Sequence, residues 1–345
     1  MQCNRREFFL AGLASRLVAQ QRAATLLDRG FATVNELAPG IYATIADSAK
    51  GPQCVSNGGV IAGRDAVLIV EGHMQPEGAA LEIEAARMVS KAPIRGAVDT
   101  HFHFDHSFGN LAYAVQRIPI LAHEKVASLM KEHYAAWQGV SYAPRLAPLE
   151  KRIAEAVDAA DRKRKEADLE AYKSMFERIA SAALAYPTEA LAPAKLPLRI
   201  DLGGVVAVIE FHAGHTVTDL IVRVPEHDLV YAGDLVFNRG FPVCLDADML
   251  AWRKALDYLA GLPQRTRFIP GHRAICGVDA VREQAALFDD LHAHAEKMVR
   301  AGAGEEEASQ RYVVPAWFSD YGIRSWDFTV GAAMRSYYKS SGKRH

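Results

Sequence analysis

The sequence predicts an α/β protein whose functional site lies where several strands end. Short apolar runs of strand length alternate with stretches of helical period, and glycines and other turn residues separate them. Histidines and aspartates follow directly after several of these runs. This alternation is typical of packed layers of strands and helices. With 345 residues, half of them hydrophobic, the chain can bury a sizeable core.

The first half of the chain is predicted to open a sheet. From about Val34 to Gly72 the pattern is strand, turn, strand, turn, strand, and the run Ala66–Val70 is continuously apolar, as in a buried strand. A helix followed by a short strand then leads into a cluster of histidines, which makes an α/β unit. The predicted elements after the first three strands are a helix over 78–91, strands over 93–98 and 118–121, and a helix over 124–134.

Residues 137–190 differ in composition from the rest of the chain. A proline-containing loop is followed by a long charged stretch with apolar positions at helical spacing. We interpret this segment as an insertion of one or two helices with a solvated charged face. We expect the domain to span residues 33–300, with residues 301–345 packing on it. Its later elements are predicted as strands over 198–201, 205–211, 219–224, 228–232 and 266–269, and helices over 248–260 and 279–300.

The N-terminus carries the sequence Asn4-Arg5-Arg6-Glu7-Phe8-Phe9-Leu10, followed by a mildly apolar run that Arg16 interrupts. This arrangement resembles a twin-arginine export signal. We expect residues 1–28 to be that signal and the protein to be periplasmic or extracellular. The alternative is an amphipathic helix on a cytoplasmic protein. No later stretch approaches the roughly 20 apolar residues of a membrane span.

Charge and cysteine content narrow the classes of partner. Forty lysines and arginines nearly balance 41 aspartates and glutamates, so no overall field favours nucleic acid or an anionic membrane. A small-molecule substrate is expected, and the sequence specifies no oligomeric state. The four cysteines lie far apart without C-x-x-C spacing, which argues against a cysteine zinc knuckle and a disulfide framework.

A dense cluster of potential metal ligands follows the strand predicted over 93–98. His101, His103, Asp105 and His106 place three imidazoles and a carboxylate within six residues. Neutral imidazole and carboxylate are good zinc ligands, and alternate side chains of one tight loop can serve two metal ions. A single histidine is usually an ordinary core or surface residue, but this density requires a functional reason.

Three further strand ends carry the same residue types. Gly214-His215-Thr216 follows one strand, Gly233-Asp234 ends another, and Gly271-His272 ends a third. A glycine beside each ligand candidate lets the backbone turn sharply. We therefore expect four strand ends to converge on one site.

The order H-x-H-x-D-H, G-H-T, G-D, G-H resembles the metallo-β-lactamase superfamily over roughly residues 34–300. The resemblance implies a four-layer αβ/βα sandwich with the site at one edge between two sheets. It also implies that two divalent ions are bound, most simply zinc, with iron or manganese as alternatives. Its implied ligands are His101, His103 and His215 for the first metal, Asp105, His106 and His272 for the second, and Asp234 as the bridge.

Other residues near the pattern are candidates for supporting roles. The family often has an aspartate after the early strand that supports the ligand loop, and here that position is Glu71. His123 and His212 can orient ligands or have purely structural roles, and His73 can face the cleft. Substrate contacts are expected from the insertion and from the loop after Asp234. In that loop Asn238 and Arg239 are candidates, although Arg239 is equally interpretable as a surface cation.

The resemblance implies a dinuclear zinc hydrolase. A metal-bridging hydroxide would attack an ester, thioester, lactone or β-lactam carbonyl, with Asp105 orienting the nucleophile and shuttling its proton. A bridging aspartate rather than a cysteine resembles the thioesterases, lactonases, phosphodiesterases and sulfatases of the fold. The alternatives are a mononuclear iron sulfur dioxygenase and a non-catalytic exported metal-binding protein.

Overall fold

The computed structural model describes residues 24–135, 138–318, 323 and 325–342. The twin-arginine motif and the expected export signal up to Ala23 lie outside the described residues. Thr25–Asp28, which falls within the segment expected to be that signal, forms strand β1 and pairs with β2. The sheet therefore begins inside the predicted 1–28 segment. Among the described residues no helix is long and apolar enough to cross a membrane.

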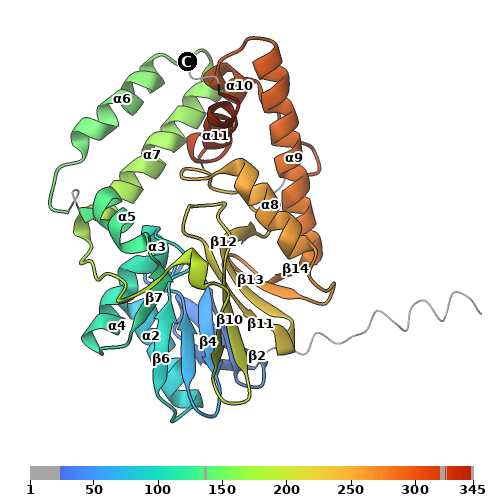
Figure 1. The fold of residues 1–345 in the computed structure, drawn as a ribbon. Helices are drawn as coiled ribbons and strands as arrows, with labels where there is room; N and C mark the ends of the chain where they lie inside the picture. Colours follow the sequence, from blue (N-terminus) through green and yellow to red (C-terminus); the bar gives the residue numbers. More distant parts are fainter. Residues whose placement is uncertain (1–23, 136–137, 319–322, 324, 343–345) are drawn as a thin grey trace, which may run out of the picture.

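The described residues form two sheets that face each other (Figure 1). The first contains eight strands in sequence order, β1 to β8, and the second contains six in the order β14-β13-β12-β11-β10-β9. The strands of the first sheet are β1 Thr25–Asp28, β2 Ala32–Ala38, β3 Ile41–Ala46, β4 Gly58–Ala62, β5 Val67–Val70, β6 Ile94–Val98, β7 Ile120–His123 and β8 Glu189–Leu191. Those of the second are β9 Leu198–Asp201, β10 Val206–Phe211, β11 Leu220–Val224, β12 Leu229–Phe237, β13 Arg267–His272 and β14 Cys276–Gly277.

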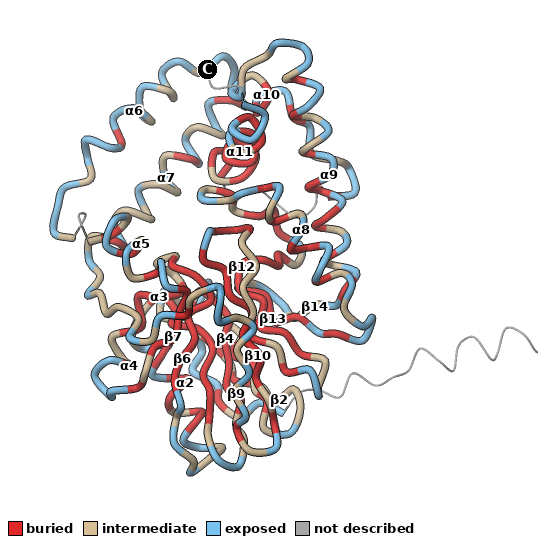
Figure 2. Tube along the Cα trace, viewed as in Figure 1, coloured by how far each residue is buried: buried red, intermediate tan, exposed pale blue. Residues whose placement is uncertain are grey.

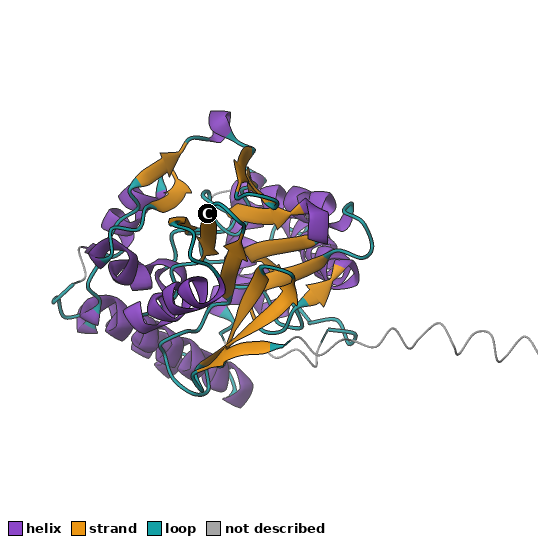
Figure 3. Cartoon of the chain, turned by 90° about the horizontal axis from the view of Figure 1, so that it is seen from below, coloured by secondary structure: helices purple, strands orange, loops and turns teal. Residues whose placement is uncertain are grey.

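Helices cover the outer faces of both sheets, which gives the four layers implied by the sequence (Figure 3). Helix α2 packs on β4 and β5, whereas α8 and α9 pack on β12. A core shared by the two inner faces includes Leu68 and Ile269, and a separate apolar cluster lies beneath each helical layer. The helices are α2 Pro76–Val89, α3 Phe104–Ser107, α4 Leu111–Val115, α5 Val126–His133, α6 Ala143–Ala154, α7 Ala159–Ser181, α8 Met249–Ala260, α9 Val278–Arg300, α10 Glu305–Arg311 and α11 Ala332–Ser340.

The insertion consists of the two helices α6 and α7, which pack against each other. Asp158 caps α7 by accepting a hydrogen bond from the Asp161 amide at 2.7 Å. Most of α6 is exposed, as Figure 2 shows, and only Leu146 of its described residues is buried. The segment ends in strand β8, which joins the first sheet, so the helical part is shorter than the predicted 137–190.

The C-terminal segment packs on both the domain and the insertion. Ser325 donates a hydrogen bond to Asp168 of α7 at 2.6 Å, and Tyr172 donates one to Asp327 at 2.9 Å. Phe318 is buried against Phe241, so this aromatic residue belongs to the core. Within the C-terminal segment lie helices α10 and α11, neither of which was predicted.

Candidate metal centre

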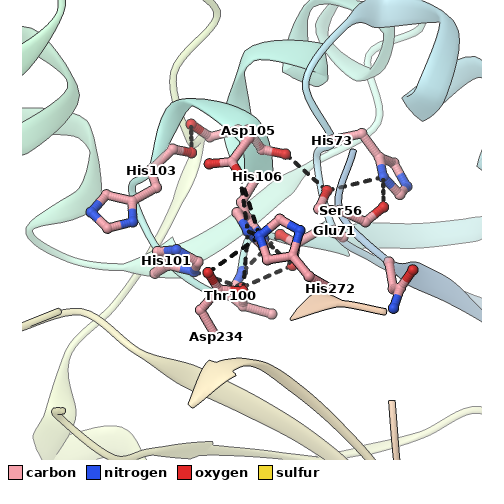
Figure 4. A network of polar contacts seen from close by, with 12 residues as sticks. Ser56, Glu71, His73, Thr100, His101, His103, Asp105, His106, Asp234 and His272 are labelled. Carbon is pink, nitrogen blue, oxygen red and sulfur yellow. Dashed lines mark hydrogen bonds and ion pairs between the residues drawn. The ribbon is translucent and has the colours of Figure 1, made fainter. Parts of the chain in front are cut away.

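The seven predicted ligands meet at one edge of the two sheets (Figure 4). His101 follows β6, and His103, Asp105 and His106 lie at the start of or within the short helix α3. His215 follows β10, and His272 is the last residue of β13. The buried runs of β6, β10 and β13 thus end at a common edge, as the sequence indicated.

Asp234 lies inside strand β12, which corrects the expectation that it ends a strand. Strand β12 runs for nine residues, all of them buried, and its pairing with β13 is irregular on both sides of Gly233. Gly233 has a φ of 51°, a value that glycine adopts without strain. The irregularity directs the Asp234 carboxylate toward the histidines while the strand continues.

The ligand atoms form three overlapping groups within 4.8 Å. One contains His101, His103 and His215, with 3.0 Å between His103 Nδ1 and His215 Nε2. Another contains Asp105, His106 and His272, and the two imidazole Nε2 atoms are 3.3 Å apart. The third, made of His101, His106 and Asp234, overlaps both.

Asp234 lies between these groups. Its Oδ2 is 3.5 Å from His215 Nε2 and 3.3 Å from His272 Nε2, and its Oδ1 is 3.3 Å from His106 Nε2. It therefore contacts a member of each half, which is the position that a bridging carboxylate requires.

Each histidine directs one nitrogen to the centre because its other nitrogen has a partner outside it. His215 Nδ1 donates to the Val243 carbonyl at 3.0 Å, and His272 Nδ1 donates to the Val55 carbonyl at 2.8 Å. His103 Nε2 lies 2.9 Å from the Asp246 carboxylate. Such outer hydrogen bonds set the tautomer and the orientation of metal-binding imidazoles.

Glu71 supports both halves of the centre. Its Oε2 is 3.0 Å from His106 Nδ1 and accepts a hydrogen bond from the Thr100 hydroxyl at 2.8 Å. That hydroxyl is in turn 3.0 Å from His101 Nδ1. Glu71 is buried and has a φ of 95°, a conformation that costs free energy for a residue with a side chain. The glutamate thus makes the supporting contacts expected of the family's aspartate.

The donor set fits a divalent metal ion. His101 Nε2 is buried and has no hydrogen-bond partner among the described residues, although its ring is held by Thr100. An unpaired buried nitrogen costs free energy unless something binds it. Imidazoles and carboxylates arranged around this atom are the ligand types that zinc prefers.

The two halves differ in electrostatics. Burial holds the pKa of His215 down to about 3, and that of His101 lies well below its ordinary value for the same reason. Burial also disfavours the charged form of His272, but the carboxylates of Asp234 and Asp105 outweigh it and raise the pKa to about 10. The first half therefore offers neutral imidazoles, and the second holds protons that a metal would displace.

Two carboxylates that sequence reasoning missed belong to this region. Asp246, in the loop before α8, orients His103 from 143 positions away in the chain, so no local pattern indicated it. Asp219 accepts hydrogen bonds from the Thr216 amide at 2.8 Å and the Thr216 hydroxyl at 2.7 Å, which holds the turn after His215. Its position three residues after Thr216 is the only local signal for this contact.

Other predicted candidates have partners elsewhere. His123 packs against Phe211, and His212 stacks on Tyr258, so neither orients a ligand through a hydrogen bond. His73 is fully buried behind the centre rather than facing a cleft. Asn238 donates its amide to the Ala274 carbonyl at 2.9 Å, which is a structural contact.

Solved structures of known proteins share this fold. A metallo-β-lactamase from Pontibacter korlensis is 16% identical, with a TM-score of 0.54 over 75% of this chain and 99% of that one. A metallo-β-lactamase from Erythrobacter litoralis is 19% identical, with a TM-score of 0.50 over 76% and 99% of the two chains. The inverting sec-alkylsulfatase Pisa1 from Pseudomonas sp. is 16% identical, with a TM-score of 0.59 over 89% of this chain. This chain spans 50% of the sulfatase.

The sequence comparisons add a family assignment. No curated protein matches the chain in sequence. The family model for the metallo-β-lactamase superfamily matches residues 51–272, a range that includes every one of the seven converging side chains. With this match over more than half of its length and a four-layer fold to accompany it, the chain belongs to the metallo-β-lactamase superfamily.

Proposed function

We propose that this protein is a dinuclear zinc hydrolase that cleaves an ester, thioester, lactone or β-lactam carbonyl. The observation that carries the proposal is the position of Asp234 between two complete ligand groups. His101, His103 and His215 would hold one ion, Asp105, His106 and His272 the other, and Asp234 would contact both. Bound divalent ions supply an activated water and polarise the bond to be cleaved.

The protein's own residues would orient the reaction. Burial by itself would raise the pKa of Asp105, but the neighbouring His106 and His272 lower it by a larger amount. The pKa therefore lies below its ordinary value, and the carboxylate is ionised at neutral pH. In the proposed reaction, the ionised Asp105 orients the attacking water molecule and accepts its proton. Glu71 and Asp246 would keep the imidazoles in place, which reduces the reorganisation needed during the reaction.

A sulfate ester is a second candidate substrate class. The similarity to the alkylsulfatase covers 89% of this chain, whereas the similarity to the Pontibacter lactamase covers 75%. The match to the sulfatase therefore includes elements of this chain that the match to the lactamase leaves out, which supports testing sulfate esters as substrates. A mononuclear iron dioxygenase and a non-catalytic exported metal-binding protein are less well supported because both ligand groups are complete. We also propose export by the twin-arginine route from the N-terminal motif.

Metal analysis with a substrate screen tests this function. The purified protein would be assayed for zinc, iron and manganese, and for hydrolysis of a chromogenic cephalosporin, lactones, thioesters and secondary alkyl sulfates. We expect close to two zinc ions per chain and turnover that a chelator abolishes. One iron per chain without hydrolysis would instead favour the dioxygenase.

A matched pair of histidine variants provides the control. His215→Ala should lose zinc and turnover. His212→Ala, three residues away, should retain both because its side chain contacts Glu210 and Tyr258 instead. Equal retention of zinc and turnover in the two variants would contradict the assigned site.

A further inference from the structure

The segment Cys54–Asn57, which precedes β4, contacts the centre on one side. The Val55 carbonyl accepts the hydrogen bond from His272 Nδ1 at 2.8 Å, and the Ser56 hydroxyl donates to the Asp105 carbonyl at 2.8 Å. The Asn57 amide donates to the Gly271 carbonyl at 2.7 Å. Successive residues of this segment thus hold two of the three ligands proposed for the second metal.

The first-metal half has different supports. His103 is held by Asp246, His215 by the Val243 carbonyl, and His101 by Thr100. None of these described hydrogen bonds involves the Cys54–Asn57 segment. A displacement of the segment should therefore disturb one half of the centre more than the other.

His73 and Glu82 lie behind the segment, away from the ligands. His73 Nδ1 is 3.1 Å from the Ser56 carbonyl and 3.1 Å from Cys54 Sγ, and its Nε2 is 3.0 Å from Glu82 Oε1. The side chains of Cys54, Ser56, His73 and Glu82 are all fully buried. Figure 4 shows the imidazole of His73 next to Ser56, on the side of the segment opposite Asp105.

Two buried polar side chains are costly unless each finds a hydrogen-bond partner, and His73 and Glu82 provide one for each other. Burial disfavours an imidazolium, yet Cys54 and Glu82 raise the pKa of His73 well above its ordinary value. Removing the Glu82 acceptor would leave the buried His73 Nε2 without its hydrogen-bond partner, which costs free energy. His73 also has a φ of 58°, and its carbonyl accepts the Gly109 amide at 3.0 Å. The surrounding structure therefore holds this imidazole in one orientation.

We propose that His73 and Glu82 are positioning residues that fix the Cys54–Asn57 segment and thereby orient His272 and Asp105 for the second metal. This inference rests on the proposed dinuclear function. The alternative is that His73 is an ordinary satisfied core residue. The two differ in outcome, because a core defect would weaken both metal sites or neither, whereas loss of the anchor would weaken the second site selectively.

A zinc titration of the metal-free full-length chain separates these readings. Glu82→Met removes the acceptor while keeping similar volume, and Glu82→Gln keeps an acceptor oxygen. We expect Glu82→Met to weaken the second zinc about tenfold or more and the first by less than about twofold. Glu82→Gln should stay close to the wild type. His73→Asn removes the imidazole from the other side of the pair, at a φ of 58° that asparagine tolerates. It should shift the second zinc in the same direction and keeps the test available if Glu82→Met does not fold.

Cobalt absorption spectra assign the two affinities to their sites. His215→Ala and His272→Ala provide reference spectra in which one half has lost a ligand. Equal weakening of both ions in Glu82→Met or His73→Asn, or no weakening in whichever of the two variants folds, would overturn the positioning role alone. A wild-type chain that binds one zinc ion would overturn the dinuclear function as well.

Discussion

Replacing Glu71 with glutamine should weaken zinc binding without unfolding the protein. One Glu71 oxygen accepts from both His106 Nδ1 and the Thr100 hydroxyl, and the other accepts from the Thr100 amide at 3.3 Å. Glutamine has the same shape but only one acceptor oxygen, so one of these buried donors faces an NH₂ group. A buried unsatisfied donor costs about 1–3 kcal/mol. Outer partners of metal ligands are typically worth about 10- to 100-fold in affinity, or about 1.4–2.7 kcal/mol.

The assay is competition for zinc between metal-free protein and a chelator of known affinity, with urea unfolding measured in parallel. Glu84→Gln is the matched control because it makes the same chemical change at a glutamate of helix α2 that forms an exposed ion pair with Arg29. Exposed pairs contribute little, so this variant should bind zinc like the wild type. Wild-type zinc affinity in a folded Glu71→Gln protein would refute the assigned role of Glu71.

Three further outcomes are expected. Asp105→Asn, reconstituted with metal, should reduce kcat at least about 100-fold, the size expected of lost acid–base assistance, while unfolding changes little; unchanged kcat would exclude the proton-shuttle role. Gly271→Ala should lower both thermal stability and zinc content, because its Cβ would overlap the buried Asp234 carboxylate; wild-type zinc content would show that the site relaxes. Zinc affinity should rise between pH 6.5 and about 9, because the raised pKa of His272, about 10, means that zinc must displace a proton throughout this window; a flat profile would contradict that protonation state.

Local sequence patterns were sufficient for most of the fold. The apolar run ending at Val70 predicted buried strand β5, and helical period predicted α2, α8 and α9 within a few residues. These elements are readable because the burial of one face imposes a period on the sequence. Short pieces such as β1 and β8 were missed or misassigned because their few residues carry no period of their own and are stabilised by pairing with a neighbouring strand.

The sequence by itself also determined which side chains converge on the centre. The close spacing of histidine and aspartate identified the candidates from His101 to His106, and neighbouring glycines identified His215, Asp234 and His272. The structure brings all of these side chains together. These signals can be read locally, because a metal ligand at the end of a strand requires a suitable side chain and a turn residue within a few positions of each other.

Only the tertiary structure decided how those side chains are held. Asp246 reaches His103 across 143 positions, and His73 meets Glu82 and Ser56 in the interior. Asp234 lies within a continuing strand because of an irregular pairing with β13. Such contacts depend on how layers pack and on which buried polar groups find partners, and neither periodicity nor residue spacing records these long-range pairings.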